Sequence, residues 1–464
     1  MKGRDETVDK FFGLKAHGTD AKTEVIAGIT TFFTMAYILF VNPTTLTDPL
    51  YIMGDPNADR YKAAVFVATC LSAFIGTMLM AVYAKIPFAQ APGMGLNAYF
   101  AYTVMLGMGY TFSQALAAVF ISGVLFILIT LFGLREAIVK AIPKNLKVAI
   151  SAGIGLFIAF IGFQNAGIIV NNDSVLLGLQ NFSEWTPAAA TALVALIGVL
   201  IIGVLYKLKV KGAIIIGIIA TTIVGIPFGV TNLSGFTLSL PDFGSFFELT
   251  FFKMDFAGLL KPENGFWGAV FNLVMVIIAF SMVDMFDTIG TLIGTAKKNN
   301  MLDEDGSMPR MKEALMCDAI ATAAGACLGT STVTTFVESS SGIAEGGRTG
   351  LTSFTTAILF LAALFLAPVV GIIPSAATAP ALIIVGVLML SSVKEIEFDD
   401  MTEAIPAFLT IAMMPFAYSI AIGIGFGVIS YVLLKTFTGK FKDFSWVTVV
   451  IALMFVIRFM FIAG

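Results

Sequence analysis

Residues 334–350 read TTFVESSSGIAEGGRTG and form a polar stretch in a chain that is otherwise mostly apolar. β-branched residues are frequent where it begins, in STVTTFV (331–337), and serines and glycines follow. Because β-branched residues favour extended backbone, we predict a short strand that continues into a short helix. Irregular backbone of this kind is tolerated at membrane depth only where protein or a water-filled cavity satisfies its amides.

The composition is that of an integral membrane protein. The chain has 464 residues, of which 58% are hydrophobic and 12% charged, with a mean hydropathy of +0.94. A soluble domain carries roughly 25% charged residues. The apolar residues fall in runs of about 17 to 25, long enough for a helix to cross the hydrocarbon core, and without the alternation of a β-barrel. We therefore predict an all-α polytopic membrane protein.

Long apolar runs and two shorter, interrupted segments are the predicted membrane segments. The long runs are 23–41, 63–84, 112–133, 148–168, 187–206, 212–229, 266–296, 312–329, 350–370, 376–392, 403–436 and 444–462. The interrupted segments are 87–107 and 331–347. Since 403–436 can hold one bent span or two, the total is about 14 or 15 segments.

Basic residues indicate the orientation of the chain. They gather before the first span, after the fourth segment and after the sixth: Lys2, Arg4, Lys10, Lys15, Lys22, Arg135, Lys140, Lys144, Lys147, Lys207, Lys209 and Lys211. Short loops rich in Lys and Arg stay in the cytoplasm, so the N-terminus is predicted to be cytoplasmic. An odd number of segments precedes the outer loop at 230–265, which predicts two halves of opposite orientation.

The first interrupted segment begins IPFAQAPGMGLN (86–97), where prolines and glycines prevent one continuous helix. Two short, Gly- or Pro-interrupted segments at corresponding positions of two halves point to a transporter's midplane site. The free N–H groups of both half-helices would face one cavity there. The structural alternative is an ordinary kink filled by neighbouring side chains.

Three acidic residues are predicted to face that cavity. Asp284 and Asp287 lie in VFNLVMVIIAFSMVDMFDTIGTLIGT (270–295), where a spacing of three places both on one helix face. Glu338 stands where the predicted strand meets its helix. A carboxylate at the membrane centre costs at least ~2.5 kcal/mol, so it normally marks a substrate or proton path. A helix cap or a bond to a neighbouring helix is the structural alternative, favoured for Asp318.

These carboxylates, with no basic residue among them, describe a pocket for a neutral ligand rich in N–H donors, because one carboxylate can accept two N–H bonds side by side. Their exchange of a proton would couple ligand movement to the proton gradient. Toward the cytoplasmic end of the short helix, Glu345 and Arg348 are predicted to pair with each other or to reach the membrane interface.

The sequence predicts no cofactor, no metal site and no catalytic group. Cys70, Cys317 and Cys327 lie in apolar runs without metal-ligand spacing and are predicted to be buried hydrophobes. A net charge of −3 disfavours a nucleic-acid partner. The lipid bilayer is the predicted surrounding, and a homodimer is compatible with a sequence that carries no signal for the oligomeric state.

Four stretches together resemble the AzgA-like purine nucleobase permeases, a branch of the nucleobase and ascorbate transporter superfamily. They are TEVIAGITTFFTMAYILFVNP (23–43), APGMGLNAYFAY (91–102), SMVDMFDTIGTL (281–292) and TVTTFVESSSGIAEGGRTGLTS (332–353). The resemblance implies two inverted seven-segment repeats, arranged as a core domain and a gate domain. The expected divisions are a leader (1–22), core (23–135 and 266–370), gate (136–230 and 371–464) and an outer loop (231–265).

The resemblance also implies roles for single residues. Asp284 and Glu338 would bind a purine, Asp287 would support the site and the proton, and Asn97 would order the cavity. Further expected neighbours of the substrate are Ser339, Gly93 and Phe336, and Asp318 is an expected supporting residue. Members of the wider superfamily often have Gln and Asn where Glu338 and Ser339 stand, so xanthine, uracil or ascorbate specificity does not transfer.

The prediction is therefore an importer of purine nucleobases, guanine and hypoxanthine or adenine, that works by proton symport in the cell membrane and is not an enzyme. An anion exchanger or channel of the same fold would need an Arg or Lys facing the half-helix starts. A membrane enzyme acting on a lipid or prenyl substrate would favour a DxxxD metal motif, whereas Asp284 and Asp287 are three apart. The sequence indicates neither which purine is preferred nor whether the coupling ion is a proton or sodium.

Overall fold

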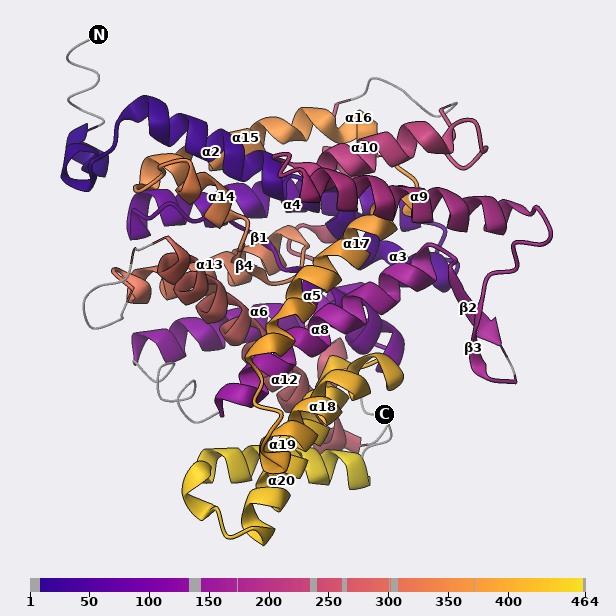
Figure 1. Cartoon of the computed structure of the whole chain (residues 1–464), viewed down its shortest axis with the longest axis vertical. Helices are drawn as coiled ribbons and strands as arrows, with labels where there is room; N and C mark the ends of the chain where they lie inside the picture. The colour runs from indigo at the N-terminus through magenta and orange to yellow at the C-terminus, as the bar shows by residue number, and fades with distance from the viewer. Residues whose placement is uncertain are drawn as a thin grey trace.

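The computed structural model describes residues 9–132, 143–172, 174–233, 240–260, 265–299, 301, 308–370 and 372–461. Its elements are almost all helical, as predicted, with two small antiparallel sheets among them (Figure 1). Four basic residues used for the predicted orientation lie outside the described ranges: Lys2, Arg4, Arg135 and Lys140.

The first span is longer than predicted. A single 3-10 turn, η1 (Lys15–His17), precedes the first helices, which are α2 (Ala21–Met35), α3 (Ile38–Ile52), α4 (Ala58–Leu79), its π-helical end η2 (Met80–Ala84) and α6 (Phe112–Leu131). The apolar helix formed by α2 and α3 runs to Ile52, whereas the prediction ended it at residue 41. Asn42 and Pro43 interrupt the apolar run in the sequence, but prolines are tolerated in membrane helices where neighbours satisfy the freed carbonyls.

The middle of the chain contains elements that were not predicted. It comprises α8 (Lys144–Asn165), the hairpin β2 (Ile169–Asn172) and β3 (Leu176–Leu179), α9 (Pro187–Lys207), α10 (Ala213–Gly225), α11 (Phe243–Ser245), η4 (Phe246–Thr250) and η5 (Gly258–Leu260). The predicted outer loop thus carries short helical turns, and an ion pair between Arg60 and Glu248 ties η4 to α4.

The second half opens with a long helix and closes with a series of shorter ones. It comprises α12 (Gly265–Lys298), α13 (Met311–Leu328), α15 (Gly350–Ala362), η6 (Ala363–Leu366), α16 (Ala367–Val370), α17 (Ser375–Leu390), η7 (Ser391–Glu395), α18 (Met401–Phe416), α19 (Ile420–Phe437), η8 (Phe441–Asp443) and α20 (Trp446–Phe461). The stretch 403–436 is two helices, because the chain turns at Tyr418 with a φ of 52°.

Both interrupted segments have the predicted form of extended chain followed by a short helix. The first is β1 (Gln90–Pro92), α5 (Met94–Ala98) and the π-helix η3 (Tyr99–Gly107). The second is β4 (Val333–Thr335) and α14 (Ser339–Ala344). β1 and β4 pair antiparallel near the middle of the bundle, with Ala91 opposite Thr334 (Figure 1).

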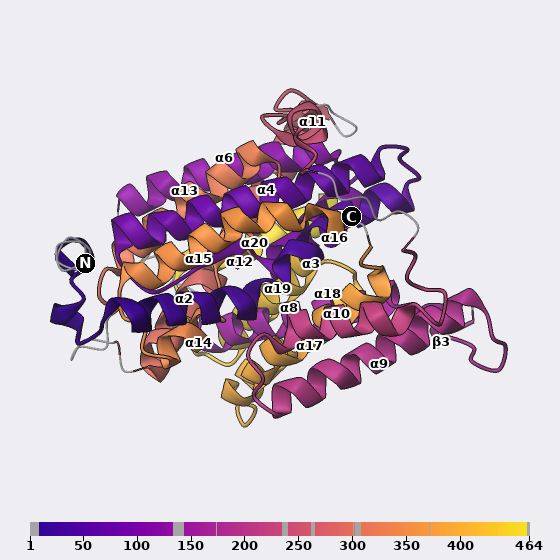
Figure 2. The ribbon, with the colours of Figure 1, turned by 90° about the horizontal axis from the view of Figure 1, so that it is seen from above.

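The helices pack in two groups. In the first, α2, α15, α4, α13 and α6 contact one another in that order, so that elements from both halves of the chain alternate (Figure 2). In the second, α8, α9 and α10 pack on α17, and α18 packs on α8 and α19. The interrupted segments and α12 lie between these groups, since α12 contacts α6, α13, α5 and α8.

Within the described ranges, nine helices are long and apolar enough to cross a membrane, which supports a multi-pass protein. Three further apolar helices are shorter: Ala213–Gly225, Met401–Phe416 and Trp446–Ile457. The total of 14 segments and the inverted repeats stay predictions. Cys70 and Cys317 are buried as predicted, and Cys327 is partly exposed.

A buried lysine joins four elements of the second group. Lys435 is 2% exposed, and its Nζ lies 2.7 Å from Glu403 and 2.9 Å from Asp443. Asn145 of α8 donates to the other oxygen of Glu403 at 3.0 Å, and the ring of Tyr431 lies 5.4 Å from the Lys435 ammonium. Removing the cation would leave the carboxylate of Glu403, which is 14% exposed, without its charged partner in a poorly hydrated place.

We expect Lys435→Met to lower the free energy of unfolding by about 3–5 kcal/mol, the usual cost of removing one partner from a buried ion pair. Thermal or denaturant unfolding of the purified protein in detergent would measure it. Lys440→Met is the matched control, because Lys440 is 42% exposed in its bond to Asp400 and such pairs contribute less than ~1 kcal/mol. Equal losses in both variants would contradict the expectation.

Candidate functional site

The strand pair fixes where the two short helices begin. Beyond the three paired positions, the Gly93 N–H donates to the carbonyl of Thr332, and the Phe336 N–H donates to that of Ala89, both at 3.0 Å. The Ala89 N–H donates to the Ser339 hydroxyl, also at 3.0 Å. These bonds satisfy backbone groups that would otherwise be costly in a buried place. They hold the starts of α5 and α14 side by side.

Gly93 is required by this close approach. It stands at the N-terminus of α5 with extended backbone, and an added Cβ would lie 2.6 Å from the Thr334 Oγ1 and 3.2 Å from its Cγ2. The predicted site residues Gly93 and Ser339 thus both belong to the junction between the interrupted segments.

Glu338 has a partner that the sequence analysis missed. The hydroxyl of Tyr37, which is 1% exposed, donates to Glu338 Oε1 at 2.8 Å. The Phe336 ring, also buried, lies 6.5 Å from the Tyr37 ring at an angle of 45°. Tyr37 sits between α2 and α3. Its hydroxyl did not stand out in the sequence, because the same span also carries Glu24 and several threonines. Glu338 is therefore oriented by the first span.

The acidic residues of α12 and α13 occupy different environments. Asp287 is partly buried, receives a 3.5 Å hydrogen bond from Thr334, and lies within electrostatic reach of Asp318 and Glu338. Asp318 is fully buried and accepts a 2.6 Å bond from Thr288, which agrees with its predicted structural pairing. Asp284 is fully enclosed within the protein. The structure thus brings Asp318 and Glu338 within electrostatic reach of Asp287, which itself contacts the β4 residue Thr334.

Asn97 links the first half-helix to the chain that enters β4. The Ser331 hydroxyl donates to its Oδ1, and its Nδ2 lies 3.6 Å from the Met94 sulfur. All atoms of Asn97 are buried. Its expected role of ordering the cavity stays a prediction.

A further buried carboxylate, which the sequence analysis did not single out, binds the chain between α14 and α15. Glu24 is fully buried in α2 and accepts bonds from the N–H groups of Arg348 and Thr352, at 2.7 and 3.1 Å, and from the Thr352 hydroxyl at 2.6 Å. It therefore satisfies free N–H groups at the start of α15. Together Tyr37 and Glu24 fasten both ends of the ESSSGIAEGGRTG stretch to the first span.

The predicted pairing of Glu345 with Arg348 is wrong. Glu345 pairs with Lys211, from the loop between α9 and α10, at 2.7 Å. The Arg348 guanidinium donates to the carbonyls of Ile343 and Gly347, at 2.6 and 2.8 Å. The reason is geometric, because the tight GG turn directs Arg348 back onto carbonyls at the end of α14.

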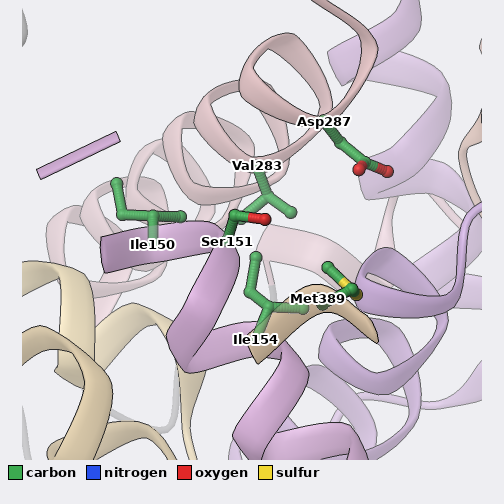
Figure 3. Close-up of a pocket in the computed structure, with 6 residues that line it drawn as sticks. All are labelled: Ile150, Ser151, Ile154, Val283, Asp287 and Met389. Atoms are coloured by element: carbon green, nitrogen blue, oxygen red, sulfur yellow. The ribbon is translucent and has the colours of Figure 1, made fainter. Parts of the chain in front are cut away.

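A small cavity lies beside Asp287, between α8, α12 and α17 (Figure 3). Its volume of about 20 Å³ has room for about one water. The lining residues are Ile150, Ser151, Ile154, Val283, Asp287 and Met389. Ile154 also packs on the first half-helix, where a Cβ added to Gly95 would lie 2.7 Å from its Cγ2. The cavity therefore adjoins the half-helix and the acidic residues.

Comparison with known proteins identifies the family. Residues 22–460 match the Permease family. The chain belongs to this family. It is 40% identical to Adenine permease AdeP of Escherichia coli K12, over 98% of this chain and 96% of that protein. It is 42% identical to Guanine/hypoxanthine permease PbuG of Bacillus subtilis, over 97% and 99%.

These relatives confirm the predicted resemblance to AzgA-like purine nucleobase permeases. Among solved structures, the fold is similar to the transmembrane domain of the cyanobacterial bicarbonate transporter BicA, with a TM-score of 0.60. That match has 14% sequence identity and covers 86% of this permease and 97% of the other chain. At this identity the likeness shows the fold alone.

We expect Gly93→Ala to destabilise the permease by roughly 1–3 kcal/mol, because the new methyl group overlaps the Thr334 side chain. Thr334→Ala in the same chain should recover much of the loss, since the nearest remaining atom would be the Thr334 Cβ at 3.5 Å, an ordinary van der Waals contact. Thermal unfolding in detergent measures both variants.

Gly203→Ala is the matched control for that experiment, because nothing lies within 4 Å of a Cβ added there. It should lose no stability. A double variant as unstable as Gly93→Ala alone would show that the strand pair tolerates the overlap in another way.

Proposed function

We propose that this permease imports purine nucleobases, guanine and hypoxanthine or adenine, together with protons. The observation that carries the proposal is the position of Asp287 and Glu338 beside the paired starts of α5 and α14. Carboxylates accept N–H bonds, so the N–H groups on a purine edge find partners. The first amides of α14 already donate to carbonyls of their own turn, so donors for the ring acceptors would come from other groups. The names of the relatives support the same substrate class.

The proposed purine site has two sets of residues. Asp284 and Glu338 would bind the N–H groups of the base, with Ser339, Gly93 and Phe336 around them. Asp287, Asn97 and Asp318 would support these residues and exchange the proton. Asp284 is fully enclosed and the cavity has room for about one water, so the site must open before a purine enters.

Opening would occur by movement of a core domain, residues 23–135 and 266–370, against a gate domain, residues 136–230 and 371–464. Two contacts join these proposed domains. Lys211 pairs with Glu345. Asn165 of α8 donates at 3.2 Å to the Tyr102 hydroxyl, which itself donates to Asp48 at 2.8 Å. Alternate breaking of these contacts would expose the site to each side in turn.

The setting would be the cell membrane with the N-terminus in the cytoplasm. A homodimer is compatible with this arrangement and is not needed for the proposed mechanism. Membership of the Permease family favours transport over the membrane-enzyme alternative. The anion alternative shares its fold with BicA, but the described residues of the cavity and strand pair include no Lys or Arg to attract an anion.

Uptake of radiolabelled guanine, hypoxanthine and adenine by purine-auxotrophic cells expressing the permease tests the proposal. We expect saturable uptake that a protonophore abolishes. Asp284→Asn and Glu338→Gln should each raise KM at least ~10-fold, because a hydrogen bond to a charged group contributes about 1.5–3 kcal/mol.

Glu248→Gln is the matched control, since the Glu248 side chain is 62% exposed in its ion pair with Arg60 of α4. Cells that express this variant should take up purines as well as cells with the wild type do. Normal membrane expression without uptake of any purine would overturn the proposed substrate class, and bicarbonate and other anions would then be tested. Purine uptake that a protonophore leaves unchanged would overturn proton coupling alone.

A further inference from the structure

We propose that Ser151 of α8 determines which purine is accepted, by donating a hydrogen bond from its hydroxyl to one acceptor atom of the bound base. The inference rests on the proposed function and deepens it. Ser151 lies on α8, in the proposed gate domain, and faces Asp287 of α12 across the cavity. The inference therefore adds a residue that determines specificity to the gate side of the site.

The position of Ser151 is the first argument. It lines the cavity beside Asp287, and the two side chains come from α8 and α12, which contact each other across it (Figure 3). The remaining lining residues are apolar: Ile150, Ile154, Val283 and Met389. Ser151 and Asp287 are therefore the two polar side chains of this cavity.

The chemistry of these two groups is complementary. An ionised carboxylate only accepts hydrogen bonds, whereas a hydroxyl donates one and accepts others. Purine bases present ring N–H groups and also ring nitrogens or a carbonyl that need a donor. Among the side chains that line the cavity, Ser151 is the one with an O–H or N–H to give while Asp287 is ionised. A base that placed an apolar C–H against Ser151 would leave the hydroxyl unpaired at a cost.

The hydroxyl is available for this bond. Serine in a helix commonly donates to the carbonyl four residues earlier, as Ser430 does to Phe426 at 2.7 Å. No such bond involves Ser151 in the part of the chain that the structure describes, and its hydroxyl lies on the cavity side of α8 (Figure 3). Its partner would therefore come from the substrate.

The cavity must enlarge before it holds a base, because a purine needs far more than the volume of about 20 Å³ found here. In the proposed mechanism α8 moves with the gate domain, so Ser151 and Asp287 would separate and a base could enter between them. Met389 has three rotatable side-chain bonds and adapts its shape easily, whereas Ser151 has a single side-chain rotation that moves heavy atoms. The two polar side chains, on opposite walls, would then set the orientation of the base.

The test pairs Ser151 with single atoms of the ligand. Uptake of a radiolabelled purine would be competed by the parent base, by its 1-, 3- and 7-deaza analogues, each of which replaces one ring nitrogen by C–H, and, for a 6-oxopurine, by the analogue that lacks the 6-oxygen. In the wild type, one analogue should compete about three- to tenfold more weakly, as expected for one neutral hydrogen bond. In Ser151→Ala that penalty should disappear, while the other analogues keep their wild-type ratios.

Ser430→Ala is the control, because its hydroxyl bonds its own helix backbone on another gate helix. It should keep the penalty for every analogue. Ser151→Cys, nearly the same size and a much weaker donor, provides the second variant if alanine lowers membrane expression, and it should also lose the penalty.

Unchanged ratios for all analogues in Ser151→Ala and Ser151→Cys, with purine uptake intact, would overturn the role of Ser151 and leave the proposed function standing. A wild-type permease that takes up no purine would overturn both. A loss of stability without a change in any ratio would mark Ser151 as a structural residue only.

Discussion

The antiparallel pairing of β1 with β4 is the contact on which the rest of the permease depends. An interrupted membrane helix exposes backbone N–H and C=O groups in a place without water, where each costs several kcal/mol if unpaired. Neither segment could satisfy these groups alone. The two segments satisfy them mutually, although Ala91 and Thr334 are far apart in the chain, so the halves of the protein must fold around each other.

This constraint explains the close packing around the pair. The starts of the two half-helices approach each other closely, which is why a glycine, Gly93, stands against the Thr334 side chain. It also explains why buried carboxylates are found here and in the first span. Glu24 accepts from N–H groups at the start of α15, and Tyr37 orients Glu338. In another membrane helix such polar groups would be destabilising. In this permease they complete the hydrogen bonding of irregular backbone.

The sequence predicted the features that local chemistry decides. Prolines, glycines and β-branched residues indicated both interrupted segments, and the carboxylates of 284–338 stood out against an apolar background. It did not indicate contacts made between distant segments. Tyr37, Glu24 and Ser151 lie in apolar runs where nothing nearby in the chain suggests a partner. Of the two alternatives for Glu345 and Arg348, the pair was wrong because Lys211 reaches Glu345 from another loop. The first span continues past Asn42 and Pro43 to Ile52.

The size of the cavity beside Asp287 has a consequence for energy use. Protons cross protein interiors along chains of hydrogen-bonded water molecules, and a space of about 20 Å³ has room for only about one. A single water cannot relay a proton from one membrane surface to the other. If transport is coupled to protons as proposed, this cavity would not by itself carry a proton leak in this conformation.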